Sequence, residues 1–134
     1  MVLDTSAVLA ILLQEPGAET LETAIEADDT RLMSAVSVLE AAIVIQARKG
    51  MAGARELDLL LRRAQVQIEP LTAEHVEIAR DAWTRFGRGN HPARLNLGDC
   101  CAYALAESSG DALLFKGADF AKTDVAAAPG SLAS

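Results

Sequence analysis

Short apolar runs alternate with longer amphipathic segments along the chain. Four runs have the length of buried strands, at residues 1–3, 31–33, 67–69 and 112–115. Elsewhere apolar side chains recur at helical spacing, as Leu21 and Ile25 do. This spacing predicts helices over residues 6–13, 18–27, 34–49, 52–67, 72–86 and 97–109. Gly50 and Gly110 are expected to end two of these helices. Strands that alternate with helices are typical of an α/β domain with a parallel sheet.

Length and composition predict one domain with an aliphatic core. The chain has 134 residues, of which 51% are hydrophobic and only 4% aromatic, and a chain of this size buries roughly two-thirds of its unfolded surface. We expect the domain to span residues 1–125 and the small, Pro- and Gly-containing tail, residues 126–134, to be partly disordered. No apolar run reaches the roughly 18 residues of a membrane span, and Asp4 interrupts the N-terminal run, so we expect no signal peptide and no membrane contact.

Charge and cysteine content narrow the function classes. The net charge is −7, which argues against binding of nucleic acid through a broad basic surface. It does not exclude a metal-dependent nuclease, in which bound cations bridge carboxylates and phosphate. Cys100 and Cys101 are adjacent and are expected to fill the core rather than form a disulfide. We therefore predict a reducing, cytoplasmic compartment.

Four acidic residues occupy unusual positions for solvated charges. Asp4 and Asp119 follow apolar runs, Glu40 lies inside an apolar stretch, and Asp99 begins a helix rich in Ala and Cys. Ligands of parallel sheets bind beyond the carboxyl ends of the strands, so residues that follow strands can meet there. Converging carboxylates suit hard cations such as Mg²⁺ or Mn²⁺, which can activate water for attack on a phosphodiester. Each acid also has a plain structural interpretation, as a helix cap, a helix-dipole partner, a polar helix edge or a turn residue.

Other polar and aromatic residues give weaker signals. Lys116, close to Asp119, could contact phosphate or offset the acids, and Arg85, Arg88 and Arg94 could guide a nucleic-acid backbone. His75 is expected to be an exposed helix residue and His91 a loop residue. Trp83 and Phe86 are expected to lie in the core rather than to stack on bases.

The order of these motifs resembles the PIN-domain family, in particular the VapC-type toxins of toxin–antitoxin pairs. The matching segments are residues 2–7, 34–40, 95–100 and 113–120, with Thr123-Asp124. The resemblance implies a three-layer α/β/α sandwich with a small, mostly parallel sheet of four or five strands. It implies that Asp4, Glu40, Asp99 and Asp119 are the catalytic and metal-binding acids, supported by Thr5 or Ser6 and by Asn96, with Asp124 as an additional acid.

The same resemblance implies an activity and partners. The activity would be Mg²⁺-dependent cleavage of RNA, such as transfer or ribosomal RNA, with Mn²⁺ able to substitute. A cognate antitoxin protein would inhibit it, and the toxin would form a homodimer. Ala118 departs from the pattern, because relatives often carry a second Asp there. Whether Asp119 or Asp124 is the fourth acid is therefore open at this stage.

Two other functions compete with this prediction. One is a catalytically silent binding module that keeps the fold. The other is a metal-dependent phosphohydrolase of a different α/β class. A phosphoaspartyl phosphatase needs a second Asp two residues after the first, where this chain has Ser6.

Overall fold

The computed structural model describes all residues, 1–134, and contains a small parallel sheet. Its strands are β1 (Val2–Leu3), β2 (Leu32–Ser34), β3 (Gln67–Glu69) and β4 (Leu113–Leu114). Their order is β3-β2-β1-β4, and every pairing is parallel. The predicted α/β class and parallel sheet are confirmed.

Five α-helices and one short 3₁₀ helix surround this sheet. They are α1 (Thr5–Leu12), α2 (Ala18–Ala27), α3 (Ala35–Arg63), α4 (Ala73–Phe86), α5 (Leu97–Ser109) and η1 (Phe120–Lys122). Gly50 interrupts α3 with a φ of 65°, a left-handed conformation that glycine adopts without steric cost. The break separates the two helices that the sequence predicted on either side of Gly50.

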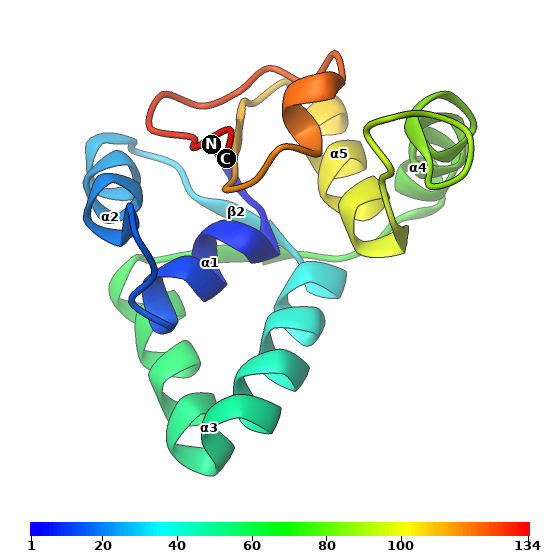
Figure 1. Ribbon diagram of the computed structural model, residues 1–134. Helices are drawn as coiled ribbons and strands as arrows, with labels where there is room; N and C mark the ends of the chain where they lie inside the picture. The colour runs from blue at the N-terminus through cyan, green and yellow to red at the C-terminus, as the bar shows by residue number, and fades with distance from the viewer.

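The strands alternate their side chains between two cores, one on each face of the sheet. Val2 and its partners Leu32 and Leu113 belong to the core beneath α4 and α5. Leu3 and its partner Leu114 face the core built with α1, α2 and α3. Figure 1 shows α4 and α5 on one side of the strands and α1 and α2 on the other. The arrangement is the expected α/β/α sandwich.

The strand order changes direction at β1. The chain first adds β2 and β3 on one side of β1 and later returns to place β4 on the other. In open parallel sheets such a reversal leaves a crevice beyond the carboxyl ends of the two flanking strands. Asp4 follows β1 and Lys116 lies just beyond β4, so both segments reach this crevice.

The C-terminal residues run beside β4. Ala127 forms a parallel bridge with Leu113, and Leu132 forms one with Lys116. Ala128 is buried in the core. The tail therefore covers the edge of β4 that β1 leaves open, as proteins commonly do with exposed strand edges. The division into a domain of residues 1–125 and a separate tail stays a prediction.

Two side chains lie elsewhere than expected. His75 is buried, because it closes a capping box with Thr72 at the start of α4. Thr72 Oγ1 accepts a hydrogen bond from the His75 N–H (3.1 Å), and His75 Nδ1 accepts one from the Thr72 N–H (3.4 Å). Trp83 is 42% exposed rather than buried, because α4 turns that face outward while Ala82 and Phe86 face the core.

None of the helices is long and apolar enough to cross a membrane.

Candidate active site

Asp4 is held at the end of β1 by the residue that starts the next helix. Its Oδ2 accepts hydrogen bonds from the Ser6 N–H (2.9 Å) and from Ser6 Oγ (2.5 Å), so it caps α1. Ser6 Oγ also accepts from the Lys116 N–H (3.0 Å), just beyond β4. Asp4 is only 4% exposed. Ser6 therefore links the first acid to the last strand of the sheet.

Asp99 lies in the first turn of α5 and is fixed by Asn96. The Asn96 side chain accepts from the Asp99 N–H (2.9 Å), and Asp99 Oδ2 accepts from the Asn96 N–H (3.0 Å). This reciprocal capping box satisfies two backbone donors that a helix start leaves free. One oxygen of Asp99 remains without a hydrogen bond from the protein.

The Glu40 carboxylate lies against the start of α5, where Gly98 has no side chain to block it. A Cβ atom built on Gly98 would lie 2.7 Å from both carboxylate oxygens of Glu40. Real Cβ atoms do not approach that closely, so any larger residue at position 98 would push the carboxylate aside. The sequence reasoning did not single out Gly98; its signal was a small residue directly before Asp99 in a helical turn.

Asp119 stands at the start of η1, exposed to solvent. Its side chain makes no capping hydrogen bond to that helix. Lys116, three residues earlier, supports the site through its backbone N–H, while its ammonium group pairs with Glu15 at 2.9 Å. Lys116 is thus already engaged by another acid.

The electrostatics indicate that the four acids share one region. Burial raises the pKa of Asp4 to about 6 against the hydrogen bonds from Ser6, and the charge of Glu40 adds to the rise. Burial also raises the pKa of Asp99 to about 7, and the charges of Asp4, Asp119 and Glu40 raise it further. None of the four carboxylates takes part in an ion pair. The fold gathers negative charge here without a protein cation to neutralise it.

The donor chemistry fits a hard divalent cation. Every candidate ligand is a carboxylate oxygen, and Mg²⁺ takes oxygen ligands, typically one or two carboxylates with several waters. No three acidic, His or Cys side chains are close enough to hold one ion together as they stand. One or two of these carboxylates would therefore hold the ion directly, and the others would act through water.

The remaining predicted residues have structural partners. Thr5 Oγ1 donates to the Ser37 carbonyl (3.2 Å), which joins the start of α1 to α3. The carboxylate of Asp124 accepts from Arg85 (2.6 Å) and from the Tyr103 hydroxyl (2.7 Å). Asp124 is not among the charges that raise the pKa of Asp99.

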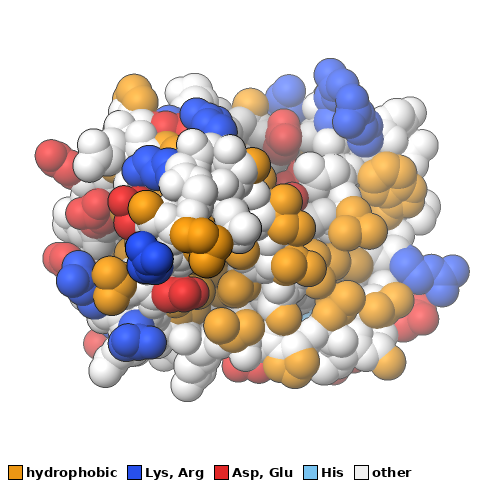
Figure 2. Space-filling view, turned by 90° about the horizontal axis from the view of Figure 1, so that it is seen from below, with side chains coloured by type: hydrophobic (Ala, Val, Ile, Leu, Met, Phe, Trp, Pro, Cys, Tyr) orange, Lys and Arg blue, Asp and Glu red, His pale blue; other side chains and the backbone are white.

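Hydrophobic side chains border the acids on the molecular surface. Figure 2 shows them gathered over the face seen from below. Leu97, which is 73% exposed, lines two neighbouring hollows. One, of about 680 Å³, lies between α4 and α5. The other, of about 220 Å³, also contains Glu40 and Gly98. We call the following exposed residues the apolar face: Leu39, Ile43, Leu71, Val76, Trp83 and Leu97.

Replacement of Gly98 by alanine is expected to separate stability from metal binding. The added methyl group displaces the Glu40 carboxylate, the flexible end of a side chain, so the free energy of unfolding should change by less than about 1 kcal/mol. Mn²⁺ affinity, measured by titration calorimetry, should fall about 10-fold or more. Gly89→Ala is the control for Mn²⁺ affinity alone, because its added Cβ atom meets nothing within 4 Å, while the positive φ of Gly89 strains the backbone of the variant. Unchanged Mn²⁺ affinity in Gly98→Ala would show that Glu40 does not act on the metal.

Comparisons with known proteins match nearly the whole chain. The sequence profile of the PIN domain matches residues 1–126. Ribonuclease VapC30 of Mycobacterium tuberculosis is 54% identical over 126 residues, which cover 94% of this chain and 96% of that protein. Ribonuclease VapC of Mycolicibacterium smegmatis is 55% identical over 127 residues, covering 95% and 98%.

Solved structures agree at the level of the fold. The crystal structure of M. tuberculosis VapC20, described as a toxin that cleaves the sarcin-ricin loop, superposes with a TM-score of 0.76 at 18% identity, covering 92% of this chain and 95% of that one. VapBC2 of Rickettsia felis, solved with a DNA fragment from its promoter, gives a TM-score of 0.70 at 16% identity, covering 98% and 94%.

Proposed function

Because the chain belongs to the PIN-domain family, we propose that it is a VapC-type toxin, a metal-dependent endoribonuclease that cleaves RNA phosphodiester bonds. The observation that carries this proposal is the group of four carboxylates at the switch point of the sheet. Negative charge that is buried at Asp4 and half-buried at Glu40 and Asp99 is unfavourable without a counter-ion, and a divalent cation would neutralise it. The names of the relatives, which are ribonucleases, support RNA as the substrate.

Four acids are assigned to the metal in this proposal. Asp4, Glu40, Asp99 and Asp119 would hold Mg²⁺, or Mn²⁺ in its place, directly or through water. When bound, the ion would supply positive charge to the phosphate oxygens and increase the acidity of water. Ser6 orients Asp4, and Asn96 orients Asp99, through the hydrogen bonds described above.

A cognate antitoxin is the inhibitory partner in this proposal. The R. felis structure is named VapBC2, which pairs a VapB with a VapC, and was solved with a DNA fragment from their promoter. This supports an antitoxin partner for this chain as well. The four unpaired carboxylates would attract a basic side chain from such a partner, because opposite charges favour each other strongly where water is excluded. We place both proteins in the cytoplasm, where the proposed RNA substrates are.

The apolar face supports a homodimer. Exposed apolar patches of this kind mark interaction sites, and a second copy offers the same patch for a two-fold interface. We expect two copies in sedimentation analysis and a single copy for Ile43→Glu, which places a charge in that interface. Leu59→Glu changes an exposed leucine outside the apolar face and should leave the dimer intact. A wild-type protein that sediments as one copy would contradict this arrangement.

Cleavage of total cellular RNA by the antitoxin-free protein tests the function. Discrete products are expected with Mg²⁺ or Mn²⁺ and none with EDTA. Sequencing of the product ends then maps the target. If the folded protein binds Mn²⁺ in calorimetry and yet cleaves no RNA, the nuclease assignment fails. If it neither binds metal nor cleaves RNA, a silent binding module becomes the better interpretation.

A further inference from the structure

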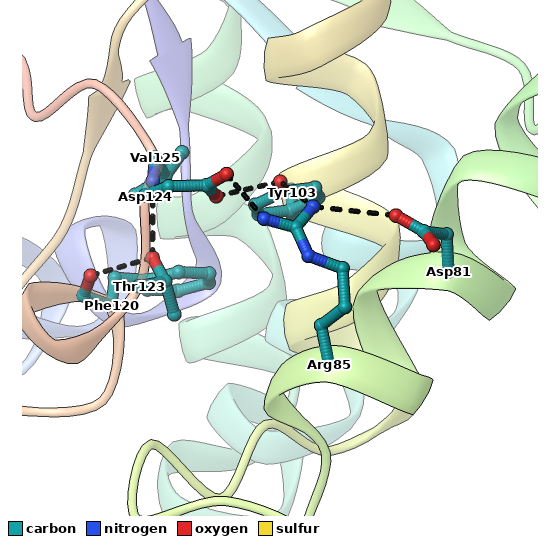
Figure 3. A network of polar contacts seen from close by, with 7 residues as sticks. All are labelled: Asp81, Arg85, Tyr103, Phe120, Thr123, Asp124 and Val125. Carbon is teal, nitrogen blue, oxygen red and sulfur yellow. Dashed lines mark hydrogen bonds and ion pairs between the residues drawn. The ribbon is translucent and has the colours of Figure 1, made fainter.

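A polar network joins the C-terminal segment to α4 and α5. The Asp124 carboxylate accepts a hydrogen bond from the buried Tyr103 hydroxyl (2.7 Å) and from Arg85 Nη2 (2.6 Å). Arg85 Nη1 also donates to Asp81 (3.3 Å) and to the Tyr103 hydroxyl oxygen (3.4 Å). Figure 3 shows Asp124 and Asp81 on opposite sides of the Arg85 guanidinium, with the Tyr103 hydroxyl beside it. Three separate segments of the chain meet at this network.

The segment between residues 116 and 124 is fixed at both ends. At its start, the Lys116 N–H donates to Ser6 Oγ, which itself donates to Asp4. In the middle, Phe120 is buried against Phe115, with ring centroids 5.5 Å apart. Near its end, Thr123 Oγ1 donates to the Phe120 carbonyl (2.7 Å) and accepts from the Val125 N–H (3.2 Å).

The Asp119 side chain lies between these two anchors without a hydrogen bond of its own. It is exposed, makes no ion pair and does not cap η1. Its position in the site therefore depends on the segment that carries it. The anchor at Tyr103 is informative, because Tyr103 lies four residues after Asp99 and so on the same side of α5. The network connects the segment that carries Asp119 to the helix that carries Asp99.

We propose that Asp124, Arg85 and Tyr103 are positioning residues, which hold the segment of Asp119 so that its carboxylate faces the metal site. This inference rests on the proposed function. It assigns the role of fourth acid to Asp119, because the Asp124 carboxylate is committed to Arg85 and Tyr103. It also gives Arg85 a role that differs from contact with the RNA backbone.

The charge states of the three groups suit this task. Burial would raise the pKa of Asp124, but the hydrogen bonds from Tyr103 and Arg85 hold it below its ordinary value. Burial and the bond to Asp124 raise the pKa of Tyr103, and the bonds to Asp124 and Asp81 raise that of Arg85. Donors and acceptor therefore keep their protonation states over the neutral pH range, and the network persists there.

A general stabilising role would be a weaker explanation. The Arg85 and Asp124 side chains are 43% and 51% exposed, and ion pairs at such positions add little to stability. The buried Tyr103 hydroxyl supplies the fixed reference point, since its ring packs with Phe86 in the core. The network is therefore expected to affect the position of the segment that carries Asp119 more than the stability of the fold.

Two variants, Tyr103→Phe and Asp124→Ala, test the proposal, with Asp81→Ala as the matched control. Asp81→Ala removes the other carboxylate on Arg85 without touching the segment. Hydrogen exchange of the amides of residues 117–123 in EDTA should become faster in both test variants and stay unchanged in the control. Mn²⁺ affinity by calorimetry should fall about 10-fold, as is typical when support of a metal ligand is lost.

The decisive comparison uses Asp119→Asn as background. If the network acts through Asp119, Tyr103→Phe should cause no further loss of Mn²⁺ affinity there. An equal 10-fold loss in both backgrounds, or wild-type affinity and exchange in Tyr103→Phe, would overturn the proposal. If the wild-type protein binds no Mn²⁺, both the proposed function and the role of the network in metal binding fail. Faster exchange in the variants would then show only that the network holds residues 117–123 in place.

Discussion

Asp4→Asn is expected to abolish RNA cleavage and, at the same time, to make the metal-free protein more stable. Loss of a group that merely supports a metal ligand lowers affinity or activity by about 10- to 100-fold, and loss of a direct ligand should exceed about 100-fold. The shape of the side chain hardly changes, and its remaining oxygen can still accept the bond from the Ser6 N–H that caps α1. The catalytic loss would therefore come from charge and not from unfolding.

The gain in stability follows from the burial of Asp4. Its pKa rises from the ordinary 3.8 to about 6, and each pKa unit corresponds to about 1.4 kcal/mol. The buried carboxylate thus opposes folding by roughly 3 kcal/mol above pH 6. Asparagine removes this term, since it carries no charge.

Urea unfolding in EDTA and cleavage in Mg²⁺, measured on the same preparations, check both parts. Asp58→Asn is the matched control, because Asp58 is exposed on α3 and forms no ion pair. It should change neither quantity. Undiminished cleavage by Asp4→Asn would remove Asp4 from the site, and a lower free energy of unfolding would show that its charge stabilises the fold.

The metal-free protein is expected to lose stability as the pH rises from about 4 to about 7. The pKa values of Asp4 and Asp99 are about 6 and about 7 in the folded protein and near 3.8 in the unfolded chain. Between these values the folded state binds more protons, so the free energy of unfolding falls with increasing pH. Asp4 alone accounts for roughly 3 kcal/mol over this interval. Asp99 adds to the fall.

At lower pH, two other acids make the free energy of unfolding rise with increasing pH. Hydrogen bonds from Thr30 and the N-terminal amine lower the pKa of Asp28, and the pKa of Asp124 is also lowered. Their contributions to stability are lost when the pH falls below about 4. The stability of the metal-free protein should therefore be greatest near about pH 4, where the two opposing effects meet.

Denaturant titrations at about pH 5 and about pH 8, with and without Mn²⁺, measure this effect. Mn²⁺ should restore stability at the higher pH and have little effect at the lower one, because protons compete for the same carboxylates. The pH dependence should shrink in Asp4→Asn. Stability that rises between these pH values in EDTA would show that burial does not raise the pKa values of Asp4 and Asp99 in the folded protein.

The sequence was sufficient to predict most of the fold, because the apolar runs and the helical spacing are strong local signals. The position of Gly50 predicted the break within α3. His75 and Trp83 were predicted wrongly for a shared reason: the rotation of α4 about its axis depends on tertiary packing. This rotation turns the capped His75 toward the core and leaves Trp83 exposed.

The acids were harder to interpret than the strands. Asp4 and Asp99 each take part in a helix cap, and the proposed function assigns both to the metal as well, so they would combine two roles that the sequence presented as alternatives. The choice between Asp119 and Asp124 depended on Arg85 and Tyr103, which lie 39 and 21 residues from Asp124. Spacing along the chain carries no information about such distant partners.

The pairing of β1 with β4 has a consequence for the time at which the protein becomes active during its synthesis. Ser6 and Lys116, whose contact brings the two ends of the site together, are 110 residues apart. While β4 is still inside the ribosome, one edge of β1 in the nascent chain is unpaired and Asp119 has not yet emerged. Because contacts this distant in sequence form late, the complete set of acids can assemble only after β4 and Asp119 have left the ribosome. A ribosome that synthesises this proposed RNA-cleaving protein therefore meets no complete set of acids until Asp119 has emerged from it.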